Sequence, residues 1–233
     1  MPILPFASVA RGSFLSRRSA LALLGAFALS ASACTPAMPI EKARVLGTGE
    51  EVTVEGYVSV QPGAFASALG DEGFAVQDST GGIYVKLEQK QSFGLDARVR
   101  ITGTLDEQNK LRILKAVPMD VDLLPGTKTV VARDVRTGDV KEPVEGRLVR
   151  VSGSFTRPFE DDSPYGYKLY IDDGSGEIQV FVHITAGFDK AALEALVASG
   201  ASITVTGLAA QYEDTYEVAP RQPSDLVRTS PIP

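Results

Sequence analysis

Two stretches of this chain repeat one pattern of apolar and polar positions. The first contains VTVEGYVSV (52–60), GFAVQDSTGGIYVKL (73–87) and RVRITGTL (98–105). The second contains LVRVSGSF (148–155), KLYIDDGSGEIQVFV (168–182) and SITVTGLA (202–209). Apolar residues alternate with polar ones in each segment, which is the period of a strand with one buried face, and each middle segment turns back at glycines as a hairpin does. The repeat therefore predicts two small barrels in tandem.

Further elements complete each predicted barrel. Residues 111–114 and 216–218 supply a fifth strand to the first and second barrel respectively. Between the third and fourth strands of the second barrel, apolar residues recur at helical spacing over 188–197, where Asp189 can cap the start of a helix and Gly200 its end. The first barrel has only QKQSFGL (89–95) at that place. The predicted fold class is all-β, with two tandem five-stranded barrels and a helix between strands three and four of the second.

The pattern also divides the chain into segments. We expect an export signal peptide at 1–33, a tether at 34–40, the first barrel at 41–126, a connector at 127–143, the second barrel at 144–229 and a tail at 230–233.

Five short strands, a glycine-bent first strand and a helix after the third strand resemble the oligonucleotide/oligosaccharide-binding (OB) barrel. Over residues 41–229 both halves look like the nucleic-acid-binding OB modules that occur in tandem or as accessory domains in exported bacterial proteins, including secreted nucleases. The resemblance implies a binding protein rather than an enzyme, with no cofactor. Its ligand would lie across the exposed faces of strands two and three.

The first residues carry an export pattern. Arg11, Arg17 and Arg18 precede an apolar run from 20 to 33, which is too short for a spanning helix. Ala31-Ser32-Ala33-Cys34 resembles a bacterial lipobox, which implies lipidation of Cys34 and a lipid-anchored protein on the periplasmic or cell-surface side of a membrane. A plain secretory signal cut after Ala33 is the alternative. The export route stays open between Sec and twin-arginine, the latter suggested by Ser16-Arg17-Arg18. The sequence also does not decide between the inner and the outer membrane.

Charge and rare residues limit the chemistry of the body. The chain has 23 Lys and Arg and 29 Asp and Glu. Removal of residues 1–33 takes away three arginines and no acid, which leaves 20 basic and 29 acidic residues and a net charge of −9. This balance disfavours duplex DNA binding by phosphate neutralisation. Cys34 and His183 are the only cysteine and histidine, which excludes an intrachain disulfide, a zinc ribbon and a multi-histidine metal site.

The candidate binding residues come from the alternation of the hairpin strands. If the aliphatic residues at 83, 85 and 87, and those at 169, 171, 178, 180 and 182, point inward, polar and aromatic residues share the outer faces. The predicted ligand-binding residues are Tyr84, Lys86, Lys168, Tyr170, Gln179 and Phe181. Tyr84, Tyr170 and Phe181 would stack bases and the lysines would contact phosphates, so single-stranded nucleic acid or another extended polymer such as an oligosaccharide is the expected ligand. The alternative is that these faces pack against the sister barrel or the connector.

Two other functions stay open. An envelope adaptor would use the same faces to hold a protein or glycan partner at the membrane. A metal-dependent hydrolase, the weaker alternative, would use the acids at 160–162, which with Asp172 and Asp173 form the densest acidic cluster. The run 172–176 is predicted to be a hairpin turn, and we assign no metal ligands or catalytic residues. His183 is expected to be a polar residue at a strand edge, and the sequence leaves the oligomeric state open.

Overall fold

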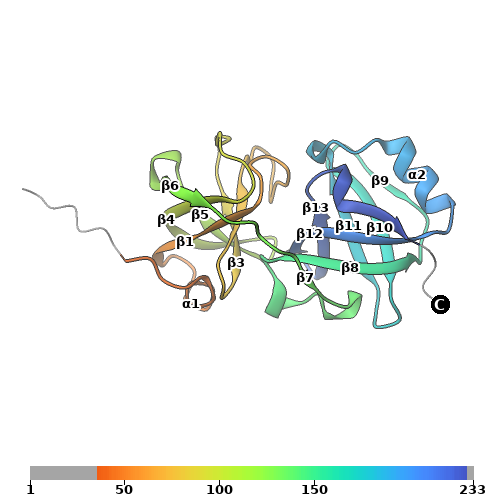
Figure 1. Ribbon diagram of the computed structural model, residues 1–233, viewed down its shortest axis with the longest axis horizontal. Helices are drawn as coiled ribbons and strands as arrows, with labels where there is room; N and C mark the ends of the chain where they lie inside the picture. The colour runs from red at the N-terminus through yellow and green to blue at the C-terminus, as the bar shows by residue number, and fades with distance from the viewer. Residues whose placement is uncertain (1–35, 230–233) are drawn as a thin grey trace, which may run out of the picture. The chain divides into compact units, whose positions relative to one another are not determined.

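Residues 36–229, the part of the chain that the computed structural model describes, form two β-barrels (Figure 1). The strands of the first are β1 (Glu51–Val60), β2 (Phe74–Gln77), β3 (Gly82–Lys86), β4 (Ala97–Gln108), β5 (Leu111–Lys115) and β6 (Val121–Thr127). Their order is β1-β2-β3-β5-β4-β6, and a further β1–β4 pairing closes the barrel. All pairs are antiparallel except β3–β5, which is parallel. This is the strand order of an OB barrel with one added edge strand, β6.

The second barrel repeats this order. Its strands are β7 (Arg133–Asp134), β8 (Leu148–Phe155), β9 (Glu160–Asp162), β10 (Gly166–Asp172), β11 (Ile178–His183), β12 (Ser202–Tyr212), β13 (Thr215–Pro220) and β14 (Leu226–Thr229). Strands β8, β10, β11, β13 and β12 form the closed barrel, again with one parallel pair, β11–β13. The predicted fold of two tandem five-stranded OB barrels is confirmed.

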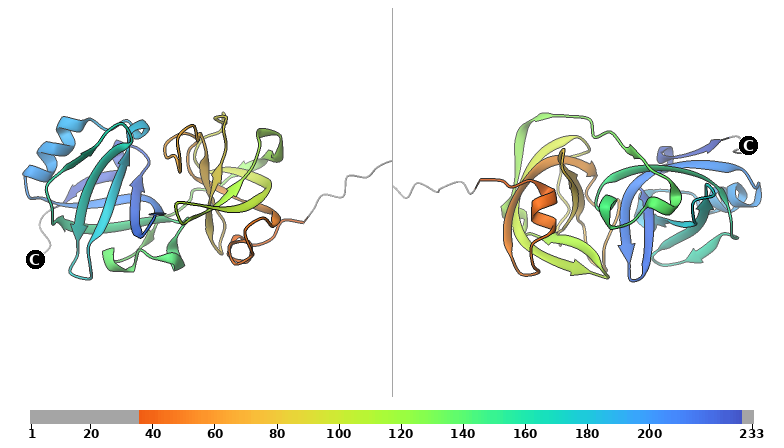
Figure 2. Two further views of the ribbon diagram at one scale, coloured as in Figure 1. Left: turned by 180° about the vertical axis from the view of Figure 1, so that it is seen from behind. Right: turned by 90° about the horizontal axis from the view of Figure 1, so that it is seen from below.

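Helices are short and few in residues 36–229. The α-helices are α1 (Ile40–Arg44) and α2 (Lys190–Ala198), and the 3-10 turns are η1 (Pro118–Asp120), η2 (Thr137–Asp139), η3 (Glu142–Val144), η4 (Ile184–Ala186) and η5 (Pro223–Asp225). Helix α2 follows β11, lies at one end of the second barrel (Figures 1 and 2) and buries Leu193 in the core. Asp189 caps it, because its carboxylate accepts a 2.8 Å hydrogen bond from the amide of Ala192. The helix predicted for this place is confirmed.

The two cores follow the predicted alternation. Ile83, Val85 and Leu87 are buried in the first core, and Leu169, Ile171, Ile178, Val180 and Val182 in the second. Where the second barrel has α2, the first has Phe93, whose ring lies edge-on to that of Phe74 with centroids 5.0 Å apart. An aromatic residue on a loop thus contacts the core there in place of a helix.

The expected tether at 34–40 is partly wrong. Met38 forms a parallel bridge to Val54, and Ile40, the first residue of α1, is fully buried in the first core. The expected connector at 127–143 also contributes to folded structure, because β7 pairs with β8 and Val140 is buried in the second core. Hydrophobic burial therefore recruits both segments into the barrels.

The predictions for the signal peptide at 1–33, for Cys34 and for the tail at 230–233 fall outside the described residues. Within residues 36–229 we find no helix with the length and apolar character needed to cross a membrane.

The glycine of each first strand marks a close crossing of two strands. A Cβ at Gly56 would lie 2.7 Å from the carbonyl oxygen of Gln77, and a Cβ at Gly153 would lie 2.9 Å from backbone atoms of Asp172. Both glycines sit where the first strand bends past the second, so the repeated glycine is required by close backbone approach.

A third apolar cluster joins the two barrels. Its buried members are Val60, Ala64, Phe65, Ala75, Tyr84, Leu111 and Ile113 from the first barrel and Leu208, Ala210 and Ala219 from the second, with Phe181 packed against them. Polar contacts reinforce it: Arg221 donates a 2.9 Å hydrogen bond to the carbonyl oxygen of Ser59 while Asp225 holds its guanidinium at 2.8 Å. The outer face of the first barrel is thus a packing surface.

Gly82 lies at this junction and provides a test of it. A Cβ at Gly82 would lie 2.1 Å from the carbonyl oxygen of Gly146, at the entry to the second barrel. We expect Gly82→Ala to lower the free energy of unfolding by about 1–3 kcal/mol, because the clash is with backbone and not with a flexible side chain. Urea denaturation would measure the loss. Gly94→Ala is the matched control, since a Cβ there meets nothing within 4 Å; equal stability of the two variants would show that the barrels do not meet at Gly82.

Candidate ligand-binding site

A cavity of about 610 Å³ lies where the loops of the two barrels meet. The second barrel contributes the outer face of β10, β11 and β13, together with the turn that follows β9 and the end of β12. The first barrel contributes the loop 61–73 between β1 and β2 and the β4–β5 turn. The polar and aromatic residues that line the cavity include Phe65, Asp71, Glu72, Gln108, Asn109, Asp162, Tyr165, Lys168, Gln179, Phe181, His183, Gln211, Tyr212 and Glu217. OB barrels bind ligands on the face of strands two and three, between the loops that follow strands one and four. Both such loops of the first barrel and the loop after the first strand of the second barrel line this one cavity.

Asp71 fixes the loop that forms the first barrel's side of the cavity. Its carboxylate, almost fully buried, accepts hydrogen bonds from the amides of Ser67 and Gly73 at 2.9 Å each and from that of Leu87 at 3.3 Å. Three backbone donors thereby compensate the buried charge and tie the loop to the end of β3. A second link crosses the barrels, because the hydroxyl of Thr185 donates to the carbonyl oxygen of Gly63 at 2.7 Å.

Three of the six predicted binding residues reach the cavity. Lys168, Gln179 and Phe181 line it, and all three belong to the second barrel. Tyr84, Lys86 and Tyr170 are not among the lining residues. The face predicted for the second barrel is therefore only partly available to a ligand of this cavity, and that of the first barrel is not.

Tyr84 points away from its own barrel core, as the alternation predicted, but it is not a stacking surface. The side chain is fully buried in the cluster that joins the barrels, and its hydroxyl donates a 2.9 Å hydrogen bond to the carbonyl oxygen of Phe65. Burial, reinforced by the charge of Asp71, raises the pKa of the hydroxyl well above its usual value. The prediction that Tyr84 stacks a base is wrong because the 61–73 loop and the second barrel cover the ring. The alternative prediction, that this face packs against the sister barrel, is confirmed at Tyr84.

The remaining polar candidates already have partners. Lys86 donates to the side chain of Gln108 at 2.9 Å. Lys168 lies 3.0 Å from Asp162 and 3.6 Å from Glu160. Partial burial acts to lower the pKa of Lys168, but the hydrogen bond with Asp162 and the two negative charges raise it. A phosphate would have to compete with two carboxylates for Lys168 and with the amide oxygen of Gln108 for Lys86.

Tyr170 lies outside the cavity and its ring is partly covered. The guanidinium carbon of Arg157 lies 4.4 Å from the ring centroid, in cation–π geometry, and the tyrosine hydroxyl donates to Glu160 at 3.0 Å. A base would have to displace Arg157 from that face of the ring.

The acidic residues considered for a hydrolase each form contacts that stabilise the fold, and they do not converge on one site. Asp161 pairs with Lys190 at 2.7 Å, and the bonds from Lys190 and Ser163 lower its pKa to about 2. The carboxylate of Asp172 accepts from the amides of Gly174 and Gly176 at 2.7 and 3.0 Å, which confirms the hairpin turn predicted for 172–176. Over residues 36–229 no group of three or more His, Cys, Asp or Glu side chains is placed to hold a metal ion.

Glu217 is the cavity residue that sequence reasoning missed. It lies on β13, opposite Gln179 on the parallel neighbour β11, and the residue is only 4% exposed. Gln179 donates a 2.7 Å hydrogen bond to its carboxylate. Burial raises the pKa of Glu217 to about 7, although Gln179 and the charge of Lys168 act in the opposite direction. The alternation of β13, in which Val218 is buried in the core, was the available signal that Glu217 faces outward beside Gln179.

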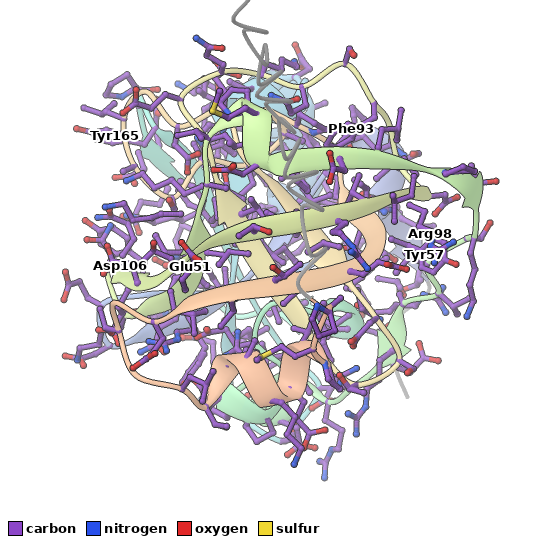
Figure 3. The ribbon with its side chains drawn as sticks, turned by 90° about the vertical axis from the view of Figure 1, so that its left-hand side faces the viewer. Glu51, Tyr57, Phe93, Arg98, Asp106 and Tyr165 are labelled. Atoms are coloured by element: carbon purple, nitrogen blue, oxygen red, sulfur yellow. The ribbon has the colours of Figure 1, made fainter. Side chains whose placement is uncertain are left out.

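Two exposed aromatic residues at the cavity were also missed. Tyr165 is 50% exposed in the turn after β9, and Tyr212 is 57% exposed at the end of β12. A different aromatic site lies on β1 and β4, where Tyr57 pairs with Arg98 (Figure 3) and the amine of Lys128 lies 5.8 Å from the Tyr57 ring centroid. Glu55 forms an ion pair with Arg98 there, so a carboxylate again accompanies the cations.

Comparison with solved structures finds matches at low sequence identity. It is similar to a murine DNA-binding protein bound with double-stranded DNA, with 12% identity over 79% of this chain and 98% of that one and a TM-score of 0.38. The chain is also similar to the HINb domain of p204, with 13% identity over 74% of this chain and 93% of that domain and a TM-score of 0.36. A replication protein A heterotrimer bound to single-stranded DNA has 12% identity over 81% of this chain and 53% of the matched chain, with a TM-score of 0.32. No family model matches the sequence, and no curated protein matches it.

Proposed function

We propose that this is an exported, lipid-anchored binding protein without catalytic activity, and that its cavity holds a segment of a glycan. The observation that carries the proposal is that the ligand-binding loops of both barrels line a single cavity of about 610 Å³. That volume suits a few sugar rings rather than a flat macromolecular contact. The export and anchoring part of the proposal is supported by the Arg17-Arg18 pair, the apolar run that follows it and Cys34.

The cavity has the side chains that a sugar requires. The side chains of Gln108, Asn109, Gln179 and Gln211 each form one hydrogen bond within the protein, and each amide keeps further donors and acceptors that can bond sugar hydroxyls. Tyr165 and Tyr212 add flat apolar faces that can cover the C–H surfaces of a sugar ring. OB barrels bind oligosaccharides as well as oligonucleotides, so this chemistry needs no departure from the fold.

The charge of the cavity favours a glycan over single-stranded nucleic acid. The lining residues include four acids, Asp71, Glu72, Asp162 and Glu217, and one lysine, Lys168, which is already paired with Asp162. A phosphate backbone needs basic residues along its path, and here it would face a majority of acids. The first alternative is single-stranded nucleic acid, whose bases would stack on Tyr170 and Phe181. The second alternative is an envelope adaptor, which would bind a protein partner.

We expect the purified protein to bind at least one member of a panel of neutral and amino oligosaccharides, four to six sugars long, in isothermal titration calorimetry. The double variant Tyr165→Ala/Tyr212→Ala should bind the same sugar about tenfold or more weakly, because each aromatic contact contributes about 1 kcal/mol. Both side chains are at least half exposed, so the variant should fold normally.

Tyr170→Ala is the matched control, since it removes a tyrosine from the same barrel outside the cavity. It should leave sugar affinity unchanged. A labelled single-stranded oligonucleotide, titrated at low and high salt, tests the competing ligand: saturable, salt-sensitive binding weakened by Tyr170→Ala, with no sugar bound, would replace the glycan proposal by nucleic-acid binding on the strand face.

A further inference from the structure

Glu217 differs from the other cavity acids in what surrounds it. Asp71 is neutralised by backbone amides, and Asp162 is paired with Lys168 at 3.0 Å. Glu217 has one hydrogen-bond partner, the side-chain amide of Gln179 at 2.7 Å, and within residues 36–229 it takes part in no ion pair. It is a nearly buried carboxylate that faces a cavity and has no cationic partner of its own.

The nearest cation does not balance the charge of Glu217. Lys168 acts on Glu217 electrostatically, but it lies within ion-pair distance of both Glu160 and Asp162. Asp162 acts on Glu217 in the opposite sense, as a like charge. Three polar side chains face Glu217: the acid Asp162 from β9, the shared Lys168 from β10 and the neutral amide of Gln179 from β11. Its paired residue on β12 is Ala210, which carries no charge. This corner of the cavity lacks one positive charge.

We propose that the bound glycan carries a primary amine, and that its ammonium group pairs with the carboxylate of Glu217. The proposal rests on the function proposed above and names the class of sugar, an amino sugar with a free amine. Gln179 holds the carboxylate in place, since its amide nitrogen donates to one oxygen and leaves the other for the ligand. A buried carboxylate gains most from such a partner, because burial withdraws the water that would otherwise stabilise its charge. The aromatic faces of the cavity can add cation–π contacts to the same ammonium group.

The test compares a glucosamine tetramer with its fully N-acetylated counterpart at pH 7.5, above the pKa of Glu217 so that its carboxylate is ionised, by isothermal titration calorimetry on the purified protein. The wild type should bind the amine form about 10- to 100-fold more tightly, which is the contribution of a hydrogen bond between charged groups. Glu217→Gln should lose this preference and keep its affinity for the N-acetylated form, because glutamine keeps the shape of the side chain. Circular dichroism would establish that the variant is folded.

Glu72→Gln is the matched control, since it removes the same charge from an exposed residue of the same cavity. It should retain the preference to within about twofold, as expected for a screened surface charge. An equal loss in both variants would replace pairing at Glu217 by diffuse attraction. Equal wild-type affinity for the two tetramers would overturn the amine proposal and leave the glycan proposal standing, whereas failure of every sugar in the panel to bind would remove both.

Discussion

Tyr84→Ala is expected to lower the free energy of unfolding by about 3–5 kcal/mol, the range for loss of a large buried aromatic side chain. The ring is fully buried between the two barrels and the 61–73 loop, and it lies edge-on to Phe65 with centroids 5.3 Å apart. Its removal leaves a void that touches both barrels and the loop, so the loop should lose one of its attachments while the hydrogen bonds to Asp71 remain. Urea denaturation measures the first effect, and faster proteolytic cleavage within 61–73 measures the second.

Tyr84→Phe separates packing from hydrogen bonding at this position. It keeps the ring and removes only the donor to the Phe65 carbonyl, so the expected loss is about 1 kcal/mol. If Tyr84→Ala were no less stable than Tyr84→Phe, the ring would not be packed between the barrels. The residue would then be accessible again as a stacking surface.

The sequence was sufficient for the barrels because their signal is local. Alternation identifies which residues of a hairpin face inward, and Ile83, Val85, Leu169 and Ile171 all do. The added edge strands had no comparable signal. Strand β6 reads VDLLPGT, in which Pro125 and Gly126 are turn residues, and β14 has only four residues, directly after η5. These strands form because β4 and β12 each offer a free edge, which is a property of the assembled sheet.

The site was predictable only in part for a related reason. A period of two assigns a residue to a face but does not say what covers that face. Alternation assigns both Tyr84 on β3 and Tyr170 on β10 to an outer face, yet the first is buried under the sister barrel and the second is partly exposed beneath Arg157. Glu217 was overlooked because no local motif marks it; its importance comes from the parallel pairing of β11 with β13, which places it beside Gln179.

Glu217→Gln should make the protein more stable than the wild type at pH 8, by about 3 kcal/mol. One pKa unit corresponds to about 1.36 kcal/mol, and burial raises the pKa of Glu217 from its ordinary value of 4.5 to about 7. Between these two values the native protein holds a proton that the unfolded chain has released. The free energy of unfolding of the wild type therefore falls as pH rises through this window and is constant above it with respect to this group. Glutamine cannot ionise, so the variant lacks that fall.

The measurement is the difference between the two proteins' unfolding free energies from pH 4 to 8, by urea denaturation. Other groups with shifted pKa values, such as Glu145 and His183, are present in both proteins and cancel in the difference. The curve should be flat below pH 4.5 and should rise in favour of the variant up to about pH 7. If the difference in unfolding free energy did not change with pH, Glu217 would be solvated in the native protein. A solvated carboxylate would gain little from a cationic ligand, so the argument for an ammonium group at this position would also fail. A rise of the expected size would show that the fold carries a destabilising buried carboxylate at its cavity, as binding sites do when a charged group is kept for a ligand.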